Sequence, residues 1–469
     1  MSARLTTALP LAAAVALVVA LAPAFGPALA TNGRPQVRRR DAQQSHRRDA
    51  ARDAAAFKLS ARDDAFLEDL SRRSFLYFKE QAHPATGLVR DRARADGTPH
   101  PPGHNSHNVA SSAATGFGLT AYCVAAERGW ITDTEARERV RTTLRYFAQR
   151  AEQFHGWFYH WTDAATGERR WNSEVSSIDT ALLLAGVLTA RQKFRNDAEI
   201  VRLATEIYGR VDFPWMLDGH PTMLSHGWRP ETGFLKNRWD TYSEHLVLDL
   251  LAVGSPTRPV TPRAWLAWQR ERITYAGHRY ITGGPLFVHQ FSHAWVDFRG
   301  RRETWYPFTD YFENSAAATR AHRAFCLALS PEFPGYTANV WGVTASDSAR
   351  GYTAWGGPPR HPDIDGTVVP CAAAGSLMFT PDISLPALRE MRDRFGERIY
   401  GRYGFADAFH PTTGWTNPDV IGIDIGITLL AAENLRTGNV WRWFMANREI
   451  GRAMDAVGLA KRRTRDAGR

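Results

Sequence analysis

Hydrophobic and polar positions follow two helical patterns that alternate along most of this chain. In the first pattern nearly every position is apolar, so no polar face remains for solvent. A helix with this pattern is buried on all sides. It predicts buried helices over residues 109–126, 175–194, 245–253 and 423–432.

In the second pattern a single apolar stripe runs along an otherwise polar segment, which is typical of a helix packed on one side. The stripe over residues 133–151 follows Thr132-x-x-Glu135, a capping box. Similar stripes predict outer helices over 196–208 with Asn196 as the candidate N-cap, 384–395 ending at Gly396, 261–273, and 438–456.

Because buried and striped helices follow each other in turn, we predict an all-α fold, an (α/α)6 toroid barrel of inner and outer helices. An irregular helical bundle with the same buried faces is the alternative. Long aromatic loops precede the inner helices and are expected at one face of the barrel. Residues 331–372 are rich in Gly and Pro and are predicted to form a long loop.

The net charge of +10 is concentrated at the two ends of the chain. Arg4 carries one of these charges, residues 31–52 carry five and residues 461–469 carry four, so residues 53–460 are net neutral. A face that binds nucleic acid is therefore not expected in the folded part.

Residues 1–30 have the pattern of a secretory signal peptide: a basic Arg4, an apolar run and a small-x-small site ending at Ala30. A membrane anchor is the alternative, but the run is short and two prolines interrupt it. We expect an exported protein, secreted or periplasmic, without stable membrane insertion. Residues 31–60 are predicted to be a disordered basic linker, 61–458 one catalytic domain and 459–469 a basic tail.

Several kinds of site are not indicated. The chain has no phosphate-binding loop, zinc-binding His-Glu-x-x-His helix or nucleophile elbow, and no cofactor or metal is expected. The odd number of cysteines leaves at least one of them unpaired. Polar loop roles rather than metal ligation are predicted for His104, His107, His155 and His160.

Carboxylates among aromatic residues are the remaining candidates for chemistry. Glu174 and Asp179 lie at the start of one buried helix, Glu244 precedes another, and Asp424 opens a third; Asp407 lies between two phenylalanines. Helix capping is the alternative role for Glu174, Asp179 and Glu244, although nearby Ser and Thr residues are better caps for Glu244. Glycoside cleavage needs two such carboxyl groups, one as acid and one as base or nucleophile.

Ordered motifs over residues 64–456 resemble the bacterial glycoamylase-like domain, which is similar to glycoside hydrolase family 144. The motifs are Glu174-Val-Ser-Ser-Ile-Asp179, His226-Gly-Trp228, Trp239-x-x-Tyr242-x-Glu244, Phe287-Val-His-Gln-Phe-Ser-His293, Trp341-Gly-x-Thr-Ala-Ser-Asp347, Tyr403-Gly-Phe-x-Asp407 and Ile423-Asp424-x-Gly426. The resemblance implies an (α/α)6 barrel that hydrolyses β-1,2-glucan with inversion, so a β-glucan polysaccharide or oligosaccharide is the expected partner.

By this resemblance Glu174 and Glu244 match acidic positions of the family's cleft, and either Asp424 or Asp407 matches the third. We expect Glu244 to donate the proton, since apolar surroundings raise the pKa of a carboxyl group. Asp424 or Asp407 would activate water, and Glu174 would hold the sugar or share the acid–base role. Candidate substrate-binding residues are Trp171, Trp228, Trp239 and Trp341 for stacking, and Asp179, His226, Tyr242, His293 and Asp347 for hydroxyl groups.

Two other functions fit the same residues. A β-1,2-glucan transglycosylase would use the same carboxylates to transfer sugar to another sugar. A non-catalytic glycan-binding protein of the cell envelope would use only the aromatic and polar surface.

Overall fold

The computed structural model describes residues 57–281, 284–305 and 309–461. The predicted signal peptide and most of the predicted linker and basic tail lie outside these residues. The helices are α2 (Ala61–Gln81), α3 (Ser112–Glu127), α4 (Asp133–Gln149), α5 (Ser177–Lys193), α6 (Ala198–Gly209), α7 (Leu246–Gly254), α8 (Arg263–Ala267), α9 (Phe291–Trp295), α10 (Tyr311–Ala328), α11 (Pro370–Ala374), α12 (Pro381–Phe395), α13 (Gly422–Arg436), α14 (Asn439–Met445) and α15 (Arg448–Ala456).

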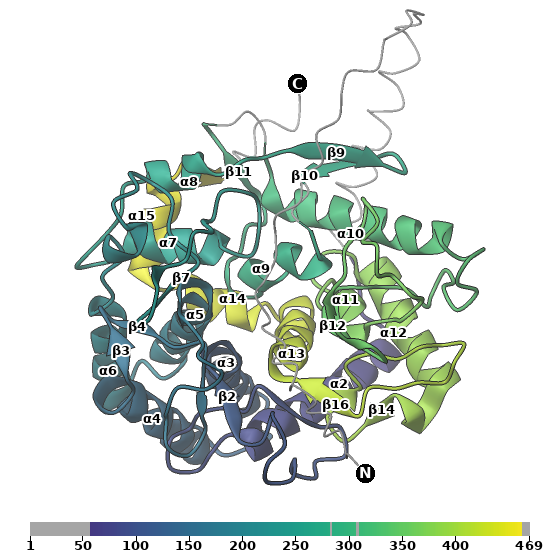
Figure 1. Cartoon of the computed structure of the whole chain (residues 1–469), viewed down its shortest axis with the longest axis horizontal. Coiled ribbons are helices and arrows are strands. Elements are labelled where there is room, and N and C mark those ends of the chain that lie inside the picture. Colours follow the sequence, from purple (N-terminus) through teal and green to yellow (C-terminus); the bar gives the residue numbers. More distant parts are fainter. Residues whose placement is uncertain (1–56, 282–283, 306–308, 462–469) are drawn as a thin grey trace, which may run out of the picture. The chain divides into compact units, whose positions relative to one another are not determined.

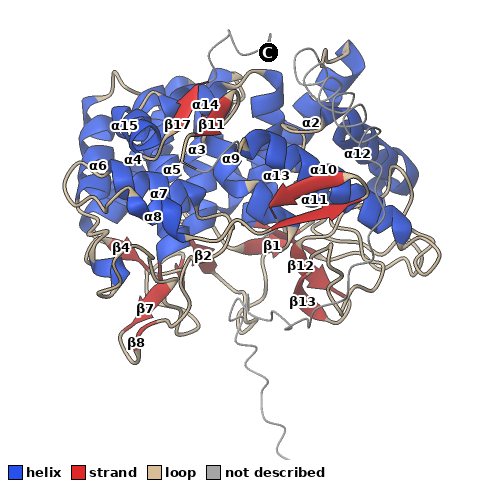
Figure 2. Cartoon of the chain, turned by 90° about the horizontal axis from the view of Figure 1, so that it is seen from above, coloured by secondary structure: helices blue, strands red, loops and turns tan. Residues whose placement is uncertain are grey.

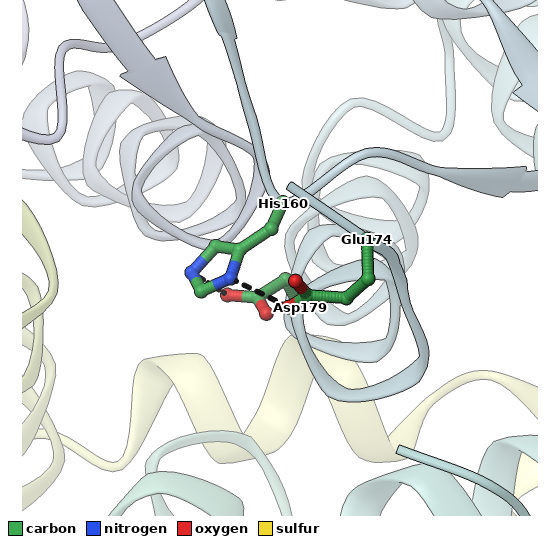
Figure 3. A group of neighbouring side chains, drawn as sticks. All are labelled: His160, Glu174 and Asp179. Carbon is green, nitrogen blue, oxygen red and sulfur yellow. Dashed lines mark hydrogen bonds and ion pairs between the residues drawn. The ribbon is translucent and has the colours of Figure 1, made fainter. Parts of the chain in front are cut away.

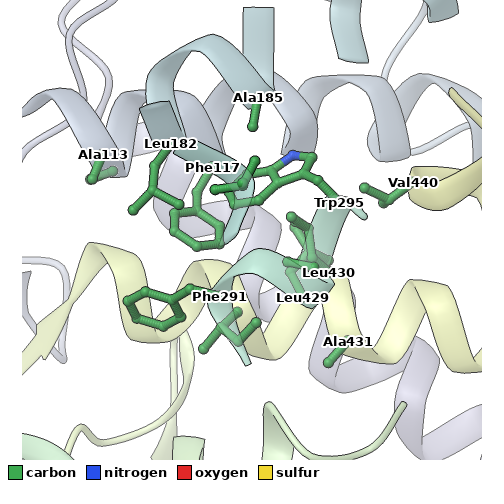
Figure 4. Close-up of a cluster of buried hydrophobic side chains, with 14 of the residues drawn as sticks. Ala113, Phe117, Leu182, Ala185, Phe291, Trp295, Leu429, Leu430, Ala431 and Val440 are labelled. Carbon is green, nitrogen blue, oxygen red and sulfur yellow. The ribbon is translucent and has the colours of Figure 1, made fainter. Parts of the chain in front are cut away.

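The helices predicted to be buried lie at the centre of the fold, as Figure 1 shows for α3, α5 and α13. Helix α3 packs against both α5 and α13, and α7 and α9 continue this inner layer. Their side chains meet in one hydrophobic cluster, in which the ring of Phe117 lies 4.6 Å from that of Trp295 (Figure 4). The prediction of buried helices from their lack of a polar face is confirmed.

Striped helices cover this inner layer. Helix α4 packs on α6, α6 packs on α5, and α2 packs on α13. The Thr132 hydroxyl accepts the backbone N–H of Glu135 at 3.1 Å, so the predicted cap at the start of α4 is confirmed. Helix α12 ends before Gly396, also as predicted; its φ of 56° favours glycine.

Helices α3 and α5 approach so closely that glycine is required where they cross. A Cβ added at Gly186 would lie 2.1 Å from the Gly116 carbonyl oxygen, and one at Gly116 would lie 2.3 Å from the Leu182 carbonyl oxygen. Backbone atoms cannot yield as a flexible side chain does, so the two helices would have to separate.

We therefore expect Gly186→Ala to lower the free energy of unfolding by about 1–3 kcal/mol, the usual cost of overpacking a core. Gly451→Ala in α15 is the matched control, because no atom lies within 4 Å of the added Cβ. It should leave stability unchanged or raise it by up to ~1 kcal/mol, since alanine favours helix. Chemical denaturation measures both; equal stabilities for the two variants would contradict the close crossing.

Short strands gather at one end of the helices. They are β1 (Arg92–Arg94), β2 (Val109–Ser111), β3 (Gln153–Phe154), β4 (Trp157–Phe158), β5 (Trp161–Asp163), β6 (Val175–Ser176), β7 (Gly227–Arg229), β8 (Gly233–Phe234), β12 (Ala345–Ser348), β13 (Gly351–Ala354), β14 (Tyr400–Gly401), β15 (Gly404–Phe405) and β16 (Asp419–Ile421). Figure 2 shows β1, β2, β4, β7, β12 and β13 on the same side, opposite β11 (Arg301–Glu303) and β17 (Leu459–Lys461).

Three of these strands lead directly into inner helices. Strand β2 pairs with β5 and runs into α3, β6 pairs with β7 and runs into α5, and β1 pairs with β16, which runs into α13; all these pairs are antiparallel. The N-terminal ends of α3, α5 and α13 therefore lie at the strand-bearing end. The residues that precede or open these helices are brought together there.

The predicted helix 261–273 is wrong over its second half. Within residues 261–273 only α8 is helical, and β9 (Arg272–Tyr275), where this range ends, pairs with β10 (His278–Ile281). Ala276 and Gly277, which join the two strands, both have positive φ. Such a two-residue turn matches the twist of antiparallel strands, so hairpin formation outweighed the apparent helical stripe.

Smaller differences concern helix ends. The predicted helix 438–456 is divided into α14 and α15 at Asn447, whose side-chain oxygen accepts from Arg191 Nη2 at 2.7 Å. Helix α6 is capped by Asp197 rather than Asn196, because the Asp197 carboxylate accepts the N–H of Ile200 at 3.2 Å. The predicted loop 331–372 contains the β12–β13 hairpin and the start of α11.

The three cysteines, Cys123, Cys326 and Cys371, are buried and unpaired. Within the described ranges, no helix has the length and apolar content needed to cross a membrane.

Candidate active site

The first acidic group at the strand-bearing end is centred on His160, which lies between β4 and β5. Its Nδ1 lies 3.0 Å from Glu174 Oε1, and its Nε2 lies 3.3 Å from Asp179 Oδ1 (Figure 3). Glu174 directly precedes β6, and Asp179 is the third residue of α5. The structure thus brings two predicted acids together through a histidine that the sequence analysis placed in a loop without a site role.

Charge controls the protonation of this group. Burial by itself lowers the pKa of His160, but the carboxylates of Asp179 and Glu174 outweigh it and raise the pKa to about 9. Burial raises the pKa of Glu174, but the hydrogen bond and charge of His160 lower it to about 2. The pKa of Asp179 is raised by burial, with His160 offsetting part of the effect. At neutral pH His160 is an imidazolium held between two acids.

Neither Glu174 nor Asp179 serves as the helix cap. The N-cap of α5 is Ser176, whose hydroxyl accepts the Asp179 N–H at 3.2 Å and donates to the Asp179 carboxylate at 2.5 Å. Helix capping therefore does not account for the position of either carboxylate.

The same three residues have the composition of a metal site, since ligand atoms of His160, Glu174 and Asp179 all lie within 4.8 Å of one another. Each ring nitrogen of His160 already faces a different carboxylate. We therefore interpret the group as an ion-paired triad.

Glu244 lies just before α7 and is 4% exposed. Burial and, to a smaller extent, the negative charge of Asp179 raise its pKa to about 7, against the opposing effect of a hydrogen bond from the Ser243 hydroxyl. A carboxyl group with this pKa keeps its proton in mildly acidic solution and can donate it. Glu244 does not cap α7, which has no side-chain cap.

The second acidic group is a pair of buried carboxyls, Asp407 and Asp424. Asp407 follows β15 and accepts hydrogen bonds from the Ser346 hydroxyl and, at 3.3 Å, from the Ile421 N–H. Asp424 is the third residue of α13. Burial raises the pKa of Asp407 to about 6, and burial together with the charge of Asp407 raises the pKa of Asp424 well above its usual range.

Two adjacent buried carboxyls cannot both ionise readily, so the pair holds one proton near neutral pH. A hydrogen bond between them lowers the pKa of Asp407 and raises that of Asp424. Because Asp407 also accepts hydrogen bonds from the Ser346 hydroxyl and the Ile421 N–H, which stabilise a negative charge, we assign the charge to Asp407 and the proton to Asp424. A cavity of about 10 Å³ is lined by both acids, enough for one water molecule.

Two residues absent from the sequence-based candidates connect the acidic groups. Asp91 accepts a hydrogen bond from Trp161 Nε1 at 3.1 Å, and its charge raises the pKa values of His160, Asp179 and Tyr352. Tyr352 lies on the β12–β13 hairpin; burial of its hydroxyl and the charges of Asp424 and Asp407 raise its pKa. The two groups thus share one electrostatic environment.

The three site residues that were not predicted, His160, Tyr352 and Asp91, differ in how far the sequence marks them. Tyr352 belongs to a stretch directly after Asp347 in a recognised motif, and His160 lies in an aromatic loop, so both had a positional signal. Asp91 precedes a short strand and has no pattern of its own.

Among the predicted stacking residues, Trp171 and Trp228 have free surface. Trp171 is 38% exposed, and Trp228 is half-buried beside Phe154. Trp239 and Trp341 are at most 5% exposed. A ring without a free face cannot stack on a sugar, so the stacking role predicted for Trp239 and Trp341 is corrected to core packing.

The predicted hydroxyl-binding residues divide in the same way. Tyr242 and His293 are buried in the core, away from solvent. His226 is half-buried and stacks on Trp239 with ring centroids 4.0 Å apart. Asp347 is half-buried and binds Arg92 Nη1 at 2.8 Å and Asn417 Nδ2 at 3.0 Å. His226 and Asp347 therefore keep some exposed surface, Asp179 is 7% exposed, and Tyr242 and His293 are closed off from solvent.

Comparison with known proteins supports the fold and identifies the family. The Glycoamylase family model, described as "Putative glucoamylase", matches residues 236–448. A protein of known crystal structure with the same description, from Bacteroides fragilis NCTC 9343, is 30% identical; the match covers 87% of this chain and 99% of that protein, with a TM-score of 0.78.

Two further relatives have named activities. An endo-β-1,2-glucanase from Chitinophaga pinensis, solved with sophorotriose and glucose, is 28% identical over 86% of this chain and 99% of its own, with a TM-score of 0.78. An exo β-1,2-glucooligosaccharide sophorohydrolase (non-reducing end) from Parabacteroides distasonis is 28% identical over 434 residues, 84% of this chain. This chain spans 58% of the length of that curated relative.

Proposed function

This chain belongs to the glycoamylase-like family of glycoside hydrolases, and on that premise we propose that it hydrolyses β-1,2-glucan at internal linkages with inversion. The observation that carries the proposal is the presence of two kinds of buried carboxyl: Glu244, kept protonated by burial and influenced by the charge of Asp179, and an Asp407–Asp424 pair that holds one proton and one charge. An acid and a base with separate protonation states are what glycoside hydrolysis requires.

In the proposed reaction Glu244 transfers its proton to the glycosidic oxygen as the bond to the anomeric carbon breaks. A water molecule attacks that carbon from the opposite face and loses a proton to Asp407. The leaving sugar gains the Glu244 proton, the new hydroxyl retains the water oxygen, and solvent exchange restores both carboxyls. The triad of Glu174, His160 and Asp179 stabilises the positive charge that develops on the sugar ring in the transition state. The same triad binds hydroxyl groups of that sugar.

The helix order supports a finer description of the fold. We propose that α2/α3, α4/α5, α6/α7, α8/α9, α10/α11 and α12/α13 are six outer–inner pairs of an (α/α)6 toroid. The contacts of α13 with α3, α9 and α11 fit closure of the inner ring. An experimental structure in which α9 or α11 left the inner layer would contradict this arrangement.

We also propose that the protein is exported after cleavage behind Ala30. N-terminal sequencing of the protein recovered outside the cytoplasm should then begin at Thr31. Recovery of the chain from the cytoplasm with its leader intact would contradict export.

The function is tested by incubation with linear β-1,2-glucan. Reducing ends should increase with a mixture of short oligosaccharides, and proton NMR should show the α-anomer first, because inversion converts a β-linkage. Oligosaccharides longer than the substrate would instead indicate transglycosylation. Tight binding without new ends would indicate a glycan-binding protein.

We expect a bell-shaped pH dependence of kcat/KM with its maximum between about pH 6 and 7. Activity rises as the Asp407–Asp424 pair loses its first proton near pH 6, and falls as Glu244 loses its proton near pH 7. The profile is measured from pH 4 to 9, with circular dichroism as the control for folding. A maximum above pH 8 would contradict Glu244 as the acid.

A further inference from the structure

A cavity of about 210 Å³ beside the acidic groups takes no part in the chemistry described above. Its walls are the C-terminal end of α2, Arg92 and Ala93 of strand β1 with Arg90 before it, and residues 97–100 and 107–108. The volume is below the roughly 300–1,000 Å³ of pockets for drug-sized ligands and suits a single sugar ring.

The cavity is continuous with the site through Arg92, which lines it. Arg92 Nη1 lies 2.8 Å from Asp347 Oδ2, and the charge of Asp407 raises the pKa of Arg92 further. On the opposite wall, Asn108 Nδ2 donates to Asp163 Oδ1 at 2.9 Å. Asp163 ends β5, which begins with Trp161 next to His160. The cavity therefore adjoins both acidic groups.

Arg90 gives this wall its binding capacity. Its guanidinium donates to two neutral amide oxygens, Gln81 Oε1 at 3.3 Å and Asn108 Oδ1 at 3.1 Å. Within residues 57–461 as far as they are described, no carboxylate forms an ion pair with it. A guanidinium has five N–H donors, so donors remain for a ligand. Amide, hydroxyl and carboxylate groups of Gln81, Thr98 and Glu80 add acceptors to the same walls.

This mixture favours a sugar over an anion. Hydroxyl groups both donate and accept, so they need donors and acceptors together, whereas an anion needs donors alone. An aromatic ring lies in the neighbourhood of the cavity, because Trp171 is 38% exposed and its Nε1 donates at 2.9 Å to Oδ1 of Asn105, which lies between lining residues His100 and His107 in the chain. Asn108 and Trp171 both hold positive φ, 57° and 54°, and such backbone strain is found more often at ligand sites.

We propose that this cavity is a distal subsite that binds one glucosyl unit of the substrate chain, with Arg90 as its principal donor. The proposal rests on the proposed function for the identity of the sugar. It predicts that only oligosaccharides long enough to place a unit in the cavity gain from Arg90. The loss should appear in binding, since Arg90 touches none of the reacting groups.

The test uses linear β-1,2-glucooligosaccharides of increasing length with Arg90→Met, Arg90→Lys and the control Arg94→Met. Arg94 lies on β1 and does not line the cavity, but its Nε donates at 2.9 Å to the lining residue Thr98, so Arg94→Met controls for an indirect disturbance of that wall. Affinity is measured by calorimetry in the Glu244→Gln background, in which the chain is not cleaved, and kcat and KM are measured with Glu244 present. Thermal unfolding shows that each variant is folded.

Above a threshold length, Arg90→Met should weaken affinity and raise KM about tenfold, the usual effect of losing hydrogen bonds to a charged group. For oligosaccharides below that length, Arg90→Met should have the same affinity and KM as the protein that keeps Arg90. The kcat of Arg90→Met should be unchanged at every length. Arg90→Lys should show a smaller loss, and Arg94→Met none. The subsite would be overturned if Arg90→Met bound every oligosaccharide as tightly as the protein that keeps Arg90. It would also be overturned if Arg90→Met lost the same factor of affinity for oligosaccharides of every length. Absence of hydrolysis by the unaltered protein would reject the proposed function alone, because the binding measurements still decide the subsite.

Discussion

Replacing Glu244 with glutamine should lower kcat on linear β-1,2-glucan by about 10²–10⁴-fold, the range that general acid catalysis contributes. Glutamine has the shape of the protonated carboxyl and cannot donate an equivalent proton. The loss should be much smaller on a substrate with an acidic phenol as leaving group, because that group departs without protonation. Steady-state kinetics on both substrates measure the difference.

The same substitution should stabilise the protein as pH rises. The pKa of Glu244 is about 7 in the folded protein and 4.5 in an ordinary environment. The unfolded chain therefore loses this proton first, and the wild-type protein loses stability progressively between those two pH values. The Tm of Glu244→Gln should exceed that of the wild type by an amount that grows over this window.

Asp249→Asn is the matched control for both effects. Asp249 lies five residues along, in α7, and burial raises its pKa to about 7 as well. It should show the same direction of Tm change with activity retained. Comparable loss of activity in the two variants would mean that Glu244 has a structural role, and near-normal activity of Glu244→Gln would remove it as the acid.

The second large effect is expected at the buried pair. Asp407→Asn should lower kcat by about 10²–10⁴-fold, because the carboxylate that accepts the proton from water is lost. Asp424→Asn should retain most activity at its optimum, because an amide N–H still donates to Asp407. Its rising limb should stay near pH 6, since Asp424 is already protonated and uncharged while Asp407 ionises.

Full pH profiles of the two variants distinguish the roles of the acids. Loss of activity in Asp424→Asn with retention in Asp407→Asn would reverse the assignment and make Asp424 the base. The structure favours Asp407 because it receives hydrogen bonds from Ser346 and the Ile421 N–H, and both stabilise a negative charge.

The buried helices could be predicted because the signal is local and large. Segments such as 175–194 lack a polar face, and no exposed arrangement of such a helix is stable in water. The Thr132 cap and the end of α12 at Gly396 depend on neighbouring backbone groups, so they too were predictable. The predicted helix 261–273 was wrong because a two-residue turn at Ala276 and Gly277 allows a strand pairing that the periodicity does not reveal.

The candidate acids were predicted as separate positions, and their relations were not. Asp91 and Asp424 are far apart in the sequence, and nothing in it indicates that the charges of both raise the pKa of Tyr352. Trp239 and Trp341 look like Trp171 in the sequence, and only packing separates core from surface. His160 has no spacing that marks it, because its partners Glu174 and Asp179 follow an intervening hairpin loop.

The sequence by itself determined which segments are helices without a polar face and which carboxyls precede them, because burial and capping depend on residues close along the chain. Only the tertiary structure decided which carboxyls share a proton, which one is held ionised by His160 and which aromatic rings keep a free face. Those properties depend on desolvation and on charges a few ångströms away, and both are set by segments that are distant in the chain and adjacent in the fold.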